Sequence, residues 1–399
     1  MFKKKIRKIS LEVNSKILKV ISLLIPKKKN LVLFGGFGGR RFGDNSAILF
    51  QYVVDNKSNV EIYWMYNSEE AAKQVAEVGG VPLSRRSLKG IWKSLRANLI
   101  VTSHGIKDAI LFEPLFHKPK LLYLNHAVPI KKGWLGIKDI DKHSIRLDKF
   151  RIKCTNYTIT SSEYSVHQQN EYLPIGKEKT KITGLPRCDV LFPKEHPKSL
   201  QKIVDERNLD KYEFIVLYAP TWRKWTTTKF FPFPDFDISK MSKTLEENNI
   251  CVALRPHHVD LNNISNQNFW LKIKSYSNFE LLTHTVCPEV DNLLRITDCL
   301  VTDYSSVLYD FLLLDRPVMI IPYDFEDYNR RVGLLVPLEE VLVGPQPKTQ
   351  KEFLQNIIDM KNGSDLFKKQ REKLKNKMFK YQDGNNSERV YKIIEELIK

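Results

Sequence analysis

Short runs of apolar residues alternate along this chain with segments in which apolar residues recur every three or four positions. The runs predict buried strands at 31–34, 60–66, 99–103, 121–124, 157–160, 214–217, 251–254, 299–301 and 318–321. The periodic segments predict helices that start near residue 46 and at 68–78, 87–96, 163–172, 239–248, 290–296, 305–314 and 350–360. This alternation is typical of an α/β fold, and it predicts two doubly wound, Rossmann-like domains of parallel strands.

A cluster of prolines and charged residues at 192–197 interrupts the alternation near its middle. We therefore expect three parts: a basic segment over 1–30, a first Rossmann-like domain over 31–195 and a second over 196–399, whose terminal helices pack back. In a pair of such domains, ligands bind at the carboxyl ends of the strands, in the cleft that the two domains face. The length of 399 residues agrees with two domains.

Residues 1–30 carry ten basic residues and one acidic residue, Glu12, so they hold half of the chain's net charge of +18. The apolar residues of this segment fall on one helical face, which consists of Ile6, Ile9, Val13, Ile17, Val20, Ile21 and Leu24. Such a basic amphipathic helix can lie on an anionic membrane surface. Alternatively, the helix packs on the body of the protein. A nucleic-acid arm is disfavoured because Phe2 is the segment's only aromatic residue for base stacking.

The five cysteines form no C-x-x-C pair, which argues against a structural zinc site and fits a reducing compartment. No run approaches the ~18 apolar residues that a membrane-spanning helix requires. The apolar content of 42% and the charged content of 28% exclude wholesale disorder. We therefore expect a globular protein of the cytoplasm.

A glycine-rich loop at 35–45 follows the first predicted strand and precedes a helix, a layout that points backbone N–H groups at an anion. The dinucleotide-binding fingerprint fails because Arg41 stands where Gly or Ala is needed. The chain also contains no G-x-x-x-x-G-K-[ST] pattern, which excludes a P-loop NTPase. This loop either faces a ligand or serves backbone geometry alone.

Side chains suited to phosphate chemistry follow several predicted strands. They comprise Thr302, Ser305 and Ser306 after 299–301, Arg255 and His257 after 251–254, and Arg223 after 214–217. The carboxyl ends of parallel strands meet at one edge of a sheet, so these side chains could surround one phosphate group. His126, which follows the strand 121–124, should face the same cleft from the first domain. Helix capping by the serines and a structural hydrogen bond from the histidine are the alternatives.

Several motifs together resemble those of the CDP-glycerol glycerophosphotransferases, the enzymes of teichoic acid and related polyol-phosphate polymer synthesis. Thr302-Asp303-Tyr304-Ser305-Ser306 is similar to the family's T-D-Y-S-S block, and residues 218–223 match Y-A-P-T-W-R. The remaining matches are Asp44-Asn45, Asn125-His126-Ala127-x-Pro129-x-Lys131-Lys132, Gly184-x-Pro186-Arg187-x-Asp189-x-Leu191, Arg255-x-His257, Arg316-Pro317 and Tyr323-Asp324. Three residues depart from the family's W-H-G-T-P-x-K motif: Asn125, Ala127 and Val128 replace Trp, Gly and Thr. We expect these departures to affect which acceptor or polyol is used more than which class of reaction is catalysed.

The resemblance implies a GT-B-type fold in which the first domain faces the acceptor and the second binds a CDP-polyol. It implies transfer of glycerol phosphate or ribitol phosphate to a polyprenyl-linked saccharide acceptor, with release of CMP. It makes His126 and His257 the catalytic residues. The donor phosphates would be bound by Arg187, Arg223, Arg255, Thr302, Ser305 and Ser306. Asp44, Asn45 and Lys131 would lie on the acceptor side.

The sequence assigns no cofactor and no metal ligand, and it leaves open whether a divalent cation assists, since Asp298, Asp303 and Asp310 lie near the predicted phosphate site. A lipid-linked acceptor would give the basic segment 1–30 a role, namely to hold the enzyme peripherally at the cytoplasmic face of the membrane. No nucleic-acid partner is expected. The alternatives are a sugar-nucleotide-dependent GT-B glycosyltransferase and a non-catalytic basic protein that binds membranes or nucleic acids.

Overall fold

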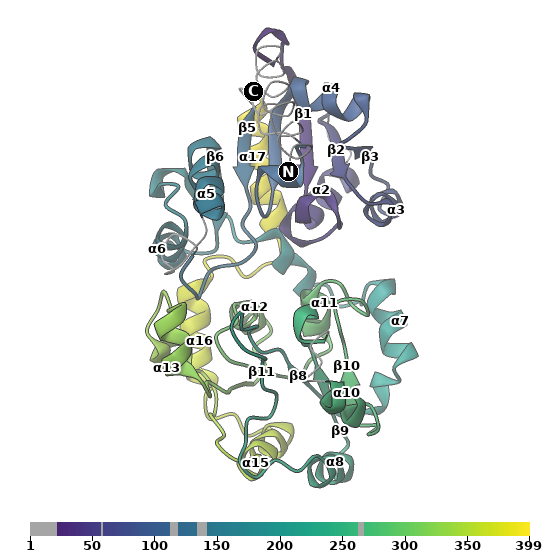
Figure 1. Ribbon diagram of the computed structural model, residues 1–399, viewed down its shortest axis with the longest axis vertical. Helices are drawn as coiled ribbons and strands as arrows, with labels where there is room; N and C mark the ends of the chain where they lie inside the picture. The colour runs from purple at the N-terminus through teal and green to yellow at the C-terminus, as the bar shows by residue number, and fades with distance from the viewer. Residues whose placement is uncertain (1–21, 57–58, 112–118, 134–141, 262–266) are drawn as a thin grey trace, which may run out of the picture.

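The computed structural model describes residues 22–56, 59–111, 119–133, 142–261 and 267–399, which form two lobes stacked along the long axis (Figure 1). The first lobe contains a seven-stranded parallel sheet with the strand order β3-β2-β1-β4-β5-β6-β7. Its strands are β1 (Lys28–Gly35), β2 (Glu61–Tyr66), β3 (Pro82–Ser84), β4 (Ala97–Thr102), β5 (Lys120–Tyr123), β6 (Thr155–Thr160) and β7 (Thr180–Ile182).

The second lobe contains a five-stranded parallel sheet with the order β10-β9-β8-β11-β12. Its strands are β8 (Phe214–Tyr218), β9 (Ile250–Leu254), β10 (Phe279–Leu281), β11 (Cys299–Thr302) and β12 (Val318–Ile320). The expected α/β class with two parallel sheets is therefore confirmed. The division at residues 195 and 196 stays a prediction.

Helices cover both sheets, and most of them connect consecutive strands. In the first lobe they are α2 (Asp44–Asp55), α3 (Glu69–Glu77), α4 (Leu88–Arg96), α5 (Lys142–Cys154) and α6 (Glu163–Tyr172). The next are α7 (Lys198–Glu206), α8 (Ile238–Glu247), α9 (His258–Leu261), α10 (Gln267–Ile273), α11 (Val290–Arg295) and α12 (Val307–Leu312). The chain ends with α13 (Phe325–Arg331), α14 (Leu338–Val341), α15 (Gln350–Lys361), α16 (Lys368–Met378) and α17 (Asn386–Ile398).

The last helix, α17, returns to the first lobe and packs on α2 and on β4 (Figure 1). Its first turn is held by Asp189, whose carboxylate accepts hydrogen bonds from the backbone N–H groups of Asn386 at 2.9 Å and Ser387 at 2.7 Å. Asp189 belongs to η6 (Pro186–Leu191), the short 3-10 helix that follows the first sheet. The C-terminus thus ties the connection between the two sheets to the first lobe.

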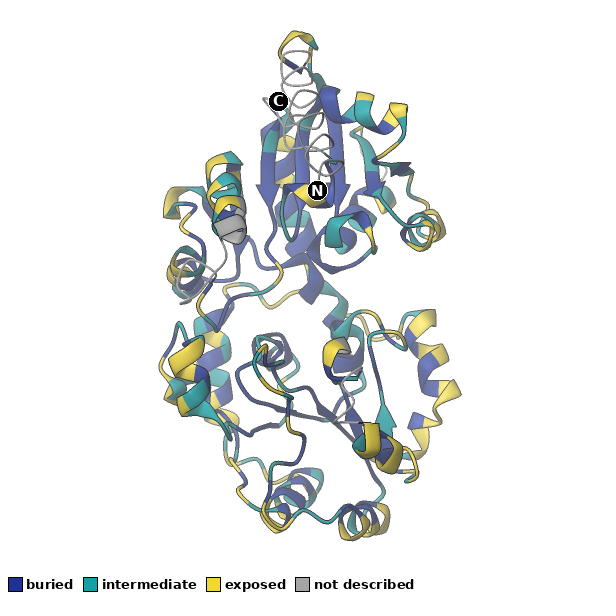
Figure 2. Cartoon of the chain, in the orientation of Figure 1, coloured by how far each residue is buried: buried dark blue, intermediate teal, exposed yellow. Residues whose placement is uncertain are grey.

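Buried apolar strands form the centre of each lobe, and exposed residues lie on the outer helices (Figure 2). In β1 the four residues from Leu31 to Phe34 are completely buried, as expected for a central strand covered on both faces. Among the described residues, no helix is both long enough and apolar enough to cross a membrane. The predicted amphipathic helix over 1–30 falls largely on residues 1–21, outside the described residues.

The two lobes are also joined directly through their backbones. Lys131, in the loop after β5, forms an antiparallel bridge with Leu334 of the second lobe. The N–H of Lys132 donates to the carbonyl of Gly333 at 3.1 Å, and the N–H of Leu335 donates to that of Ile130 at 2.8 Å. This short ladder fixes the loop that carries His126 and Lys131 against the second lobe.

Candidate active site

One cavity of about 670 Å³ lies between the lobes, where the loops after several strands converge. His126 and Lys131 line it from the first lobe, and Arg255, His257, Ser305 and Ser306 line it from the second. The juxtaposition expected from the sequence, with His126 across a cleft from the second-lobe residues, is therefore present. None of the described residues that line the cavity is an aspartate or a glutamate. The walls favour a negatively charged ligand.

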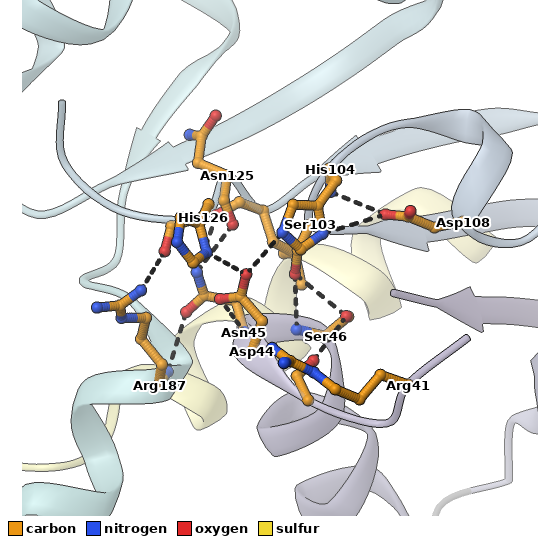
Figure 3. Close-up of polar contacts among 12 residues, drawn as sticks. Arg41, Asp44, Asn45, Ser46, Ser103, His104, Asp108, Asn125, His126 and Arg187 are labelled. Atoms are coloured by element: carbon orange, nitrogen blue, oxygen red, sulfur yellow. Dashed lines mark hydrogen bonds and ion pairs between the residues drawn. The ribbon is translucent and has the colours of Figure 1, made fainter. Parts of the chain in front are cut away.

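His126 is held by a carboxylate from a different element (Figure 3). Its Nδ1 lies 2.5 Å from Oδ2 of Asp44, the first residue of α2. Because an ionised carboxylate can only accept, Nδ1 carries the proton and Nε2 is left to exchange a proton with a ligand. The His126 side chain is exposed at the cavity wall, whereas Asp44 is buried. This is the arrangement in which a carboxylate orients an imidazole for general base catalysis.

Asp44 remains ionised despite its burial. Burial alone would raise its pKa, but the charges and hydrogen bond of the neighbouring His126 and His104 outweigh this effect and lower the pKa to about 2. The backbone of Asp44 has a φ of 65°, which a short polar residue tolerates better than most. A buried anion is thus fixed beneath the cavity wall.

Two asparagines shape the loop around His126. Asn125 has a φ of 59°, and its Nδ2 donates to Thr158 Oγ1 at 2.9 Å and to the carbonyl of Ile159 at 2.7 Å. Asn45 is buried, and its Nδ2 donates to the carbonyl of Asn125 at 2.9 Å. The chain therefore turns sharply after β5 and projects His126 towards the cavity. Asn45 supports this turn from the interior rather than facing an acceptor.

His104 is a site residue that the sequence did not single out. It follows β4, its Nε2 lies 3.3 Å from the same Oδ2 of Asp44, and its ring lies 5.3 Å from that of His126 (Figure 3). On its other side, Nδ1 lies 3.7 Å from Oδ2 of Asp108. Burial alone would lower the pKa of His104, but the two carboxylates outweigh it and raise the pKa. The sequence carries a signal for it, because His104 directly follows the predicted strand 99–103, much as His126 follows the predicted strand 121–124.

Asp44, His104 and His126 place their ligand atoms within 4.8 Å of one another, close enough to be considered for a metal ion. Two donors to one zinc ion stand roughly 3.3 Å apart, since each lies about 2.0–2.2 Å from the ion. The separation of 2.5 Å between His126 Nδ1 and Asp44 Oδ2 is shorter and is that of a hydrogen bond. The three side chains, as placed, do not fit a metal ion.

On the opposite wall, His257 is oriented by its own loop and by an aromatic neighbour. Its ring stacks on Trp222 at 5.0 Å between centroids, and its Nδ1 accepts from the backbone N–H of Val259 at 3.4 Å. Arg255 also lines the cavity, but its guanidinium donates to the carbonyls of Leu282 at 2.9 Å and Pro288 at 3.1 Å. Arg255 therefore shapes the loop over 282–288 as well as contributing charge to the cavity.

Ser305 and Ser306 place hydroxyl groups on the same wall, immediately before α12. Lys131 reaches the cavity from the first lobe, and burial lowers the pKa of its ammonium group. Among the described residues, the ammonium group has no hydrogen-bonding partner. Lys131 is half-buried at the cavity wall, and since burying an unpaired ammonium group is costly, it is suited to pair with an anion in the cavity.

Two residues predicted to bind donor phosphates are instead buried in the second lobe. Arg223 is fully buried and pairs with Asp303 at 2.6 Å and with Asp324 at 2.7 Å. Its carbon Cζ also lies 4.9 Å from the centre of the Tyr323 ring. Thr302 is buried too, and its hydroxyl donates to the carbonyl of Ala219 at 2.8 Å. The hydrogen-bond donors of both side chains are occupied inside the lobe, and direct phosphate binding by either residue stays a prediction.

Arg187 is likewise engaged inside the protein. Its guanidinium is buried, with Nη1 donating to the carbonyl of His126 at 2.6 Å and Nη2 paired with Asp310 and Asp291 of the second lobe. It thus anchors the His126 loop to α11 and α12 instead of reaching a ligand. Asp303 and Asp310, considered for a divalent cation, are occupied by these arginines, and Asp298 accepts from the N–H of Ile215 at 2.8 Å.

The two Rossmann-like lobes that face a cationic cleft form a GT-B-like fold, and comparison with known proteins gives the family. The sequence model of the CDP-glycerol:poly(glycerophosphate) glycerophosphotransferases matches residues 17–396, so the chain belongs to this family. The resemblance drawn from the motifs and the enzyme class that it implies are both confirmed. The roles of individual site residues stay predictions.

Curated relatives cover nearly the whole chain. A teichoic acid glycerol-phosphate transferase of Staphylococcus aureus is 24% identical over 380 residues, which are 92% of this chain and 93% of the relative. A teichoic acid poly(glycerol phosphate) polymerase of Bacillus spizizenii is 26% identical over 90% of each chain. Among solved structures, the wall teichoic acid polymerase TagF superposes with a TM-score of 0.78 at 20% identity, over 100% of this chain and 97% of that one. The GT-B-like fold is thereby confirmed.

Proposed function

We propose that this chain transfers a polyol phosphate, either glycerol phosphate or ribitol phosphate, from a CDP-polyol to a hydroxyl group of a polyprenyl-linked saccharide. CMP is the second product, and the reaction belongs to the synthesis of teichoic acid or a related cell-wall or capsule polymer. Membership of the glycerophosphotransferase family and the names of the relatives support this proposal.

The observation that carries the proposal is the charge of the cavity. Among the described residues, no carboxylate lines it. The basic side chains and histidines that line it come from both lobes and are Arg41, His126, Lys131, Arg255, His257 and His284. A CDP-polyol carries a diphosphate, so it would place concentrated negative charge between these side chains. The hydroxyls of Ser305 and Ser306 supply further donors on the second lobe.

In the proposed reaction, the acceptor oxygen attacks the phosphorus that bears the polyol. A new P–O bond forms, the bond from this phosphorus to the bridging oxygen breaks, and CMP leaves with the bridging oxygen. Nε2 of His126 takes the hydroxyl proton, while Asp44 holds the Nδ1 proton and stabilises the imidazolium that results. Positioning and electrostatics carry most of such a phosphoryl transfer.

The second lobe would hold the donor. His257, which stacks on Trp222, would neutralise charge on the departing phosphate. Lys131 would reach the donor from the first lobe, because its loop is tied to Leu334 of the second lobe. The acceptor would then approach from the side of His126. Because a polyprenyl chain stays in the bilayer, we place the enzyme peripherally at the cytoplasmic face of the membrane.

The test is to offer the purified chain a lipid-linked disaccharide with CDP-glycerol, CDP-ribitol or UDP-glucose in turn, and to identify products by mass spectrometry. We expect release of CMP and a product heavier by one or more polyol phosphate groups with at least one CDP-polyol. Formation of UDP and a hexosylated product would instead establish the sugar-nucleotide glycosyltransferase. No reaction with any of the three donors would contradict the proposal.

A further inference from the structure

A second histidine contacts the carboxylate that orients His126. Nε2 of His104 lies 3.3 Å from Oδ2 of Asp44, the same oxygen that faces Nδ1 of His126 (Figure 3). The other carboxylate oxygen, Oδ1, accepts a hydrogen bond from the N–H of Asn45 at 2.7 Å. One carboxylate oxygen therefore serves two imidazoles, and the reaction proposed above uses only one of them.

The loop after β4 holds His104 beside Asp44. Asp108 accepts hydrogen bonds at 2.8 Å from the backbone N–H of His104 and from that of Gly38 in the glycine-rich loop. The hydroxyl of Ser103 accepts from the N–H of Ser46 in the first turn of α2 at 3.0 Å. These bonds tie the loop both to the glycine-rich loop and to the start of α2. The place of His104 next to the carboxylate is thus fixed by the backbone.

The charged groups around His104 favour its protonated form. Its Nε2 faces Asp44, and its Nδ1 lies 3.7 Å from Oδ2 of Asp108, so a carboxylate lies beside each ring nitrogen. Burial and the charge of Arg151 on α5 oppose protonation, but the two carboxylates outweigh them and raise the pKa of His104. The uncharged ring of Phe37 covers the imidazole at 4.3 Å between centroids. His104 is therefore suited to carry a positive charge.

The two imidazoles compete for the negative charge of one carboxylate. Their ring centres lie 5.3 Å apart, so a charge on one ring disfavours a charge on the other. The charge of Arg187 also acts on Asp44. Of the two histidines, it is His104 that lies beside a second carboxylate, that of Asp108. The first proton that this group of side chains takes up should therefore go to His104 rather than to His126.

We propose that His104 is a positioning residue, which holds the Asp44 carboxylate and carries the proton that this carboxylate attracts, so that His126 stays neutral. A general base must be neutral, because a protonated imidazole has no lone pair with which to accept the hydroxyl proton of the acceptor. Asp44 thus orients His126 without charging it before the reaction. The inference deepens the proposed function and rests on it for the kinetic test below, but not for the titration that follows.

The kinetic test compares His104→Gln and His104→Ala with His167→Gln, which replaces an exposed histidine on α6, all in the full-length chain. Glutamine keeps a neutral hydrogen-bond donor for Asp44, whereas alanine removes both the donor and the charge. We expect the acidic limb of the pH profile of kcat/KM to move to higher pH by about one unit in both His104 variants, because a proton on His126 is no longer repelled. The control should match the wild type.

The two His104 variants should differ in the plateau value of kcat. We expect it to fall about 10-fold further in His104→Ala than in His104→Gln, because only alanine leaves Asp44 without this donor. Thermal unfolding checks that each variant is folded. An acidic limb that does not move in His104→Gln would overturn the inference, and a loss of kcat and donor affinity with an unmoved limb would assign His104 a structural role instead.

An NMR titration of the chain labelled at its histidine rings gives a measurement that does not depend on turnover. The signals of His104 and His126 are assigned by their absence from His104→Gln and His126→Asn. As the pH falls, the His104 signal should shift first, and the midpoint for His126 should rise by about one pH unit in His104→Gln. A His126 signal that shifts first in the wild type would overturn the inference. If the wild type releases no CMP from either CDP-polyol, the proposed function fails, while this titration still decides the inference.

Discussion

Nδ1 of His126 lies 2.5 Å from Oδ2 of Asp44, although 82 residues separate them in the sequence. The contact depends on two turns with positive φ, one at Asp44 at the start of α2 and one at Asn125 after β5. It fixes the imidazole so that Nε2 is free to serve the cavity. The pair therefore has the geometry expected of a general base and the carboxylate that orients it.

Replacing Asp44 with Asn should lower kcat by about 100-fold or more. The amide keeps the shape of the side chain but cannot stabilise the imidazolium that forms during proton transfer. The affinity for the CDP-polyol should change little, because Asp44 does not line the cavity. Steady-state kinetics and calorimetric titration with the donor would measure the two effects. Asp55→Asn, the same substitution at the exposed far end of α2, is the matched control; an equal loss in both variants would argue against the assignment.

The raised pKa of His104 predicts a pH-dependent contribution to stability. Because its pKa is higher in the folded than in the unfolded chain, the stabilisation is fully present below about pH 6.5 and is lost as the pH rises through the folded pKa. The destabilisation caused by His104→Asn should therefore be larger at about pH 6 than at about pH 9. Urea unfolding at both pH values measures it. His167→Asn, which replaces an exposed histidine on α6, controls for the substitution; a pH-independent difference for His104 would contradict the prediction.

Replacement by methionine should affect stability and donor binding differently at Arg223 and at Lys131. Removing Arg223 leaves Asp303 buried without its partner and should cost about 3–5 kcal/mol of unfolding free energy. Lys131→Met should keep or raise the unfolding free energy, because it removes an unpaired ammonium group, and it should weaken donor binding by about 10-fold or more, because it removes a charge-assisted contact to phosphate. Chemical unfolding and donor titration together distinguish the two outcomes. A stable Arg223→Met protein with weakened donor binding would restore Arg223 to the phosphate site.

The sequence predicted the central strands correctly because they are continuous apolar runs buried on both faces. It missed β3, β7 and β10, which are three-residue edge strands with only one buried residue each, so no continuous apolar run marks them. The equally short β12 was predicted because all three of its residues are apolar and buried. The helix α16 was missed for a different reason. Its sequence is almost entirely polar, and only Arg371, Leu374 and Met378 are buried.

In the candidate site, too, some features could be predicted from the sequence and others could not. Positions at the ends of strands were predictable, because the carboxyl ends of parallel strands meet at one edge of a sheet. His126, His257, Ser305 and Ser306 do line one cavity. Whether an arginine near such a position points to a ligand or into the lobe was not predictable, because this depends on distant partners. Arg223 meets Asp324, 101 residues away, and Arg187 meets Asp310, 123 residues away. The partnership of His104 with Asp44 is likewise a product of the fold alone.

The central claim is that His126 acts on the acceptor while the second lobe holds the donor, and the asparagine variant of His126 tests it most directly. Donor affinity is measured by calorimetry with CDP-glycerol and CDP-ribitol, and turnover is measured as CMP released in the presence of the lipid-linked acceptor. We predict that His126→Asn binds the donor as the wild type does and loses about 100-fold to 10,000-fold in kcat, whereas His257→Ala loses turnover and donor affinity together. A His126→Asn enzyme that releases CMP at close to the wild-type rate would contradict the account.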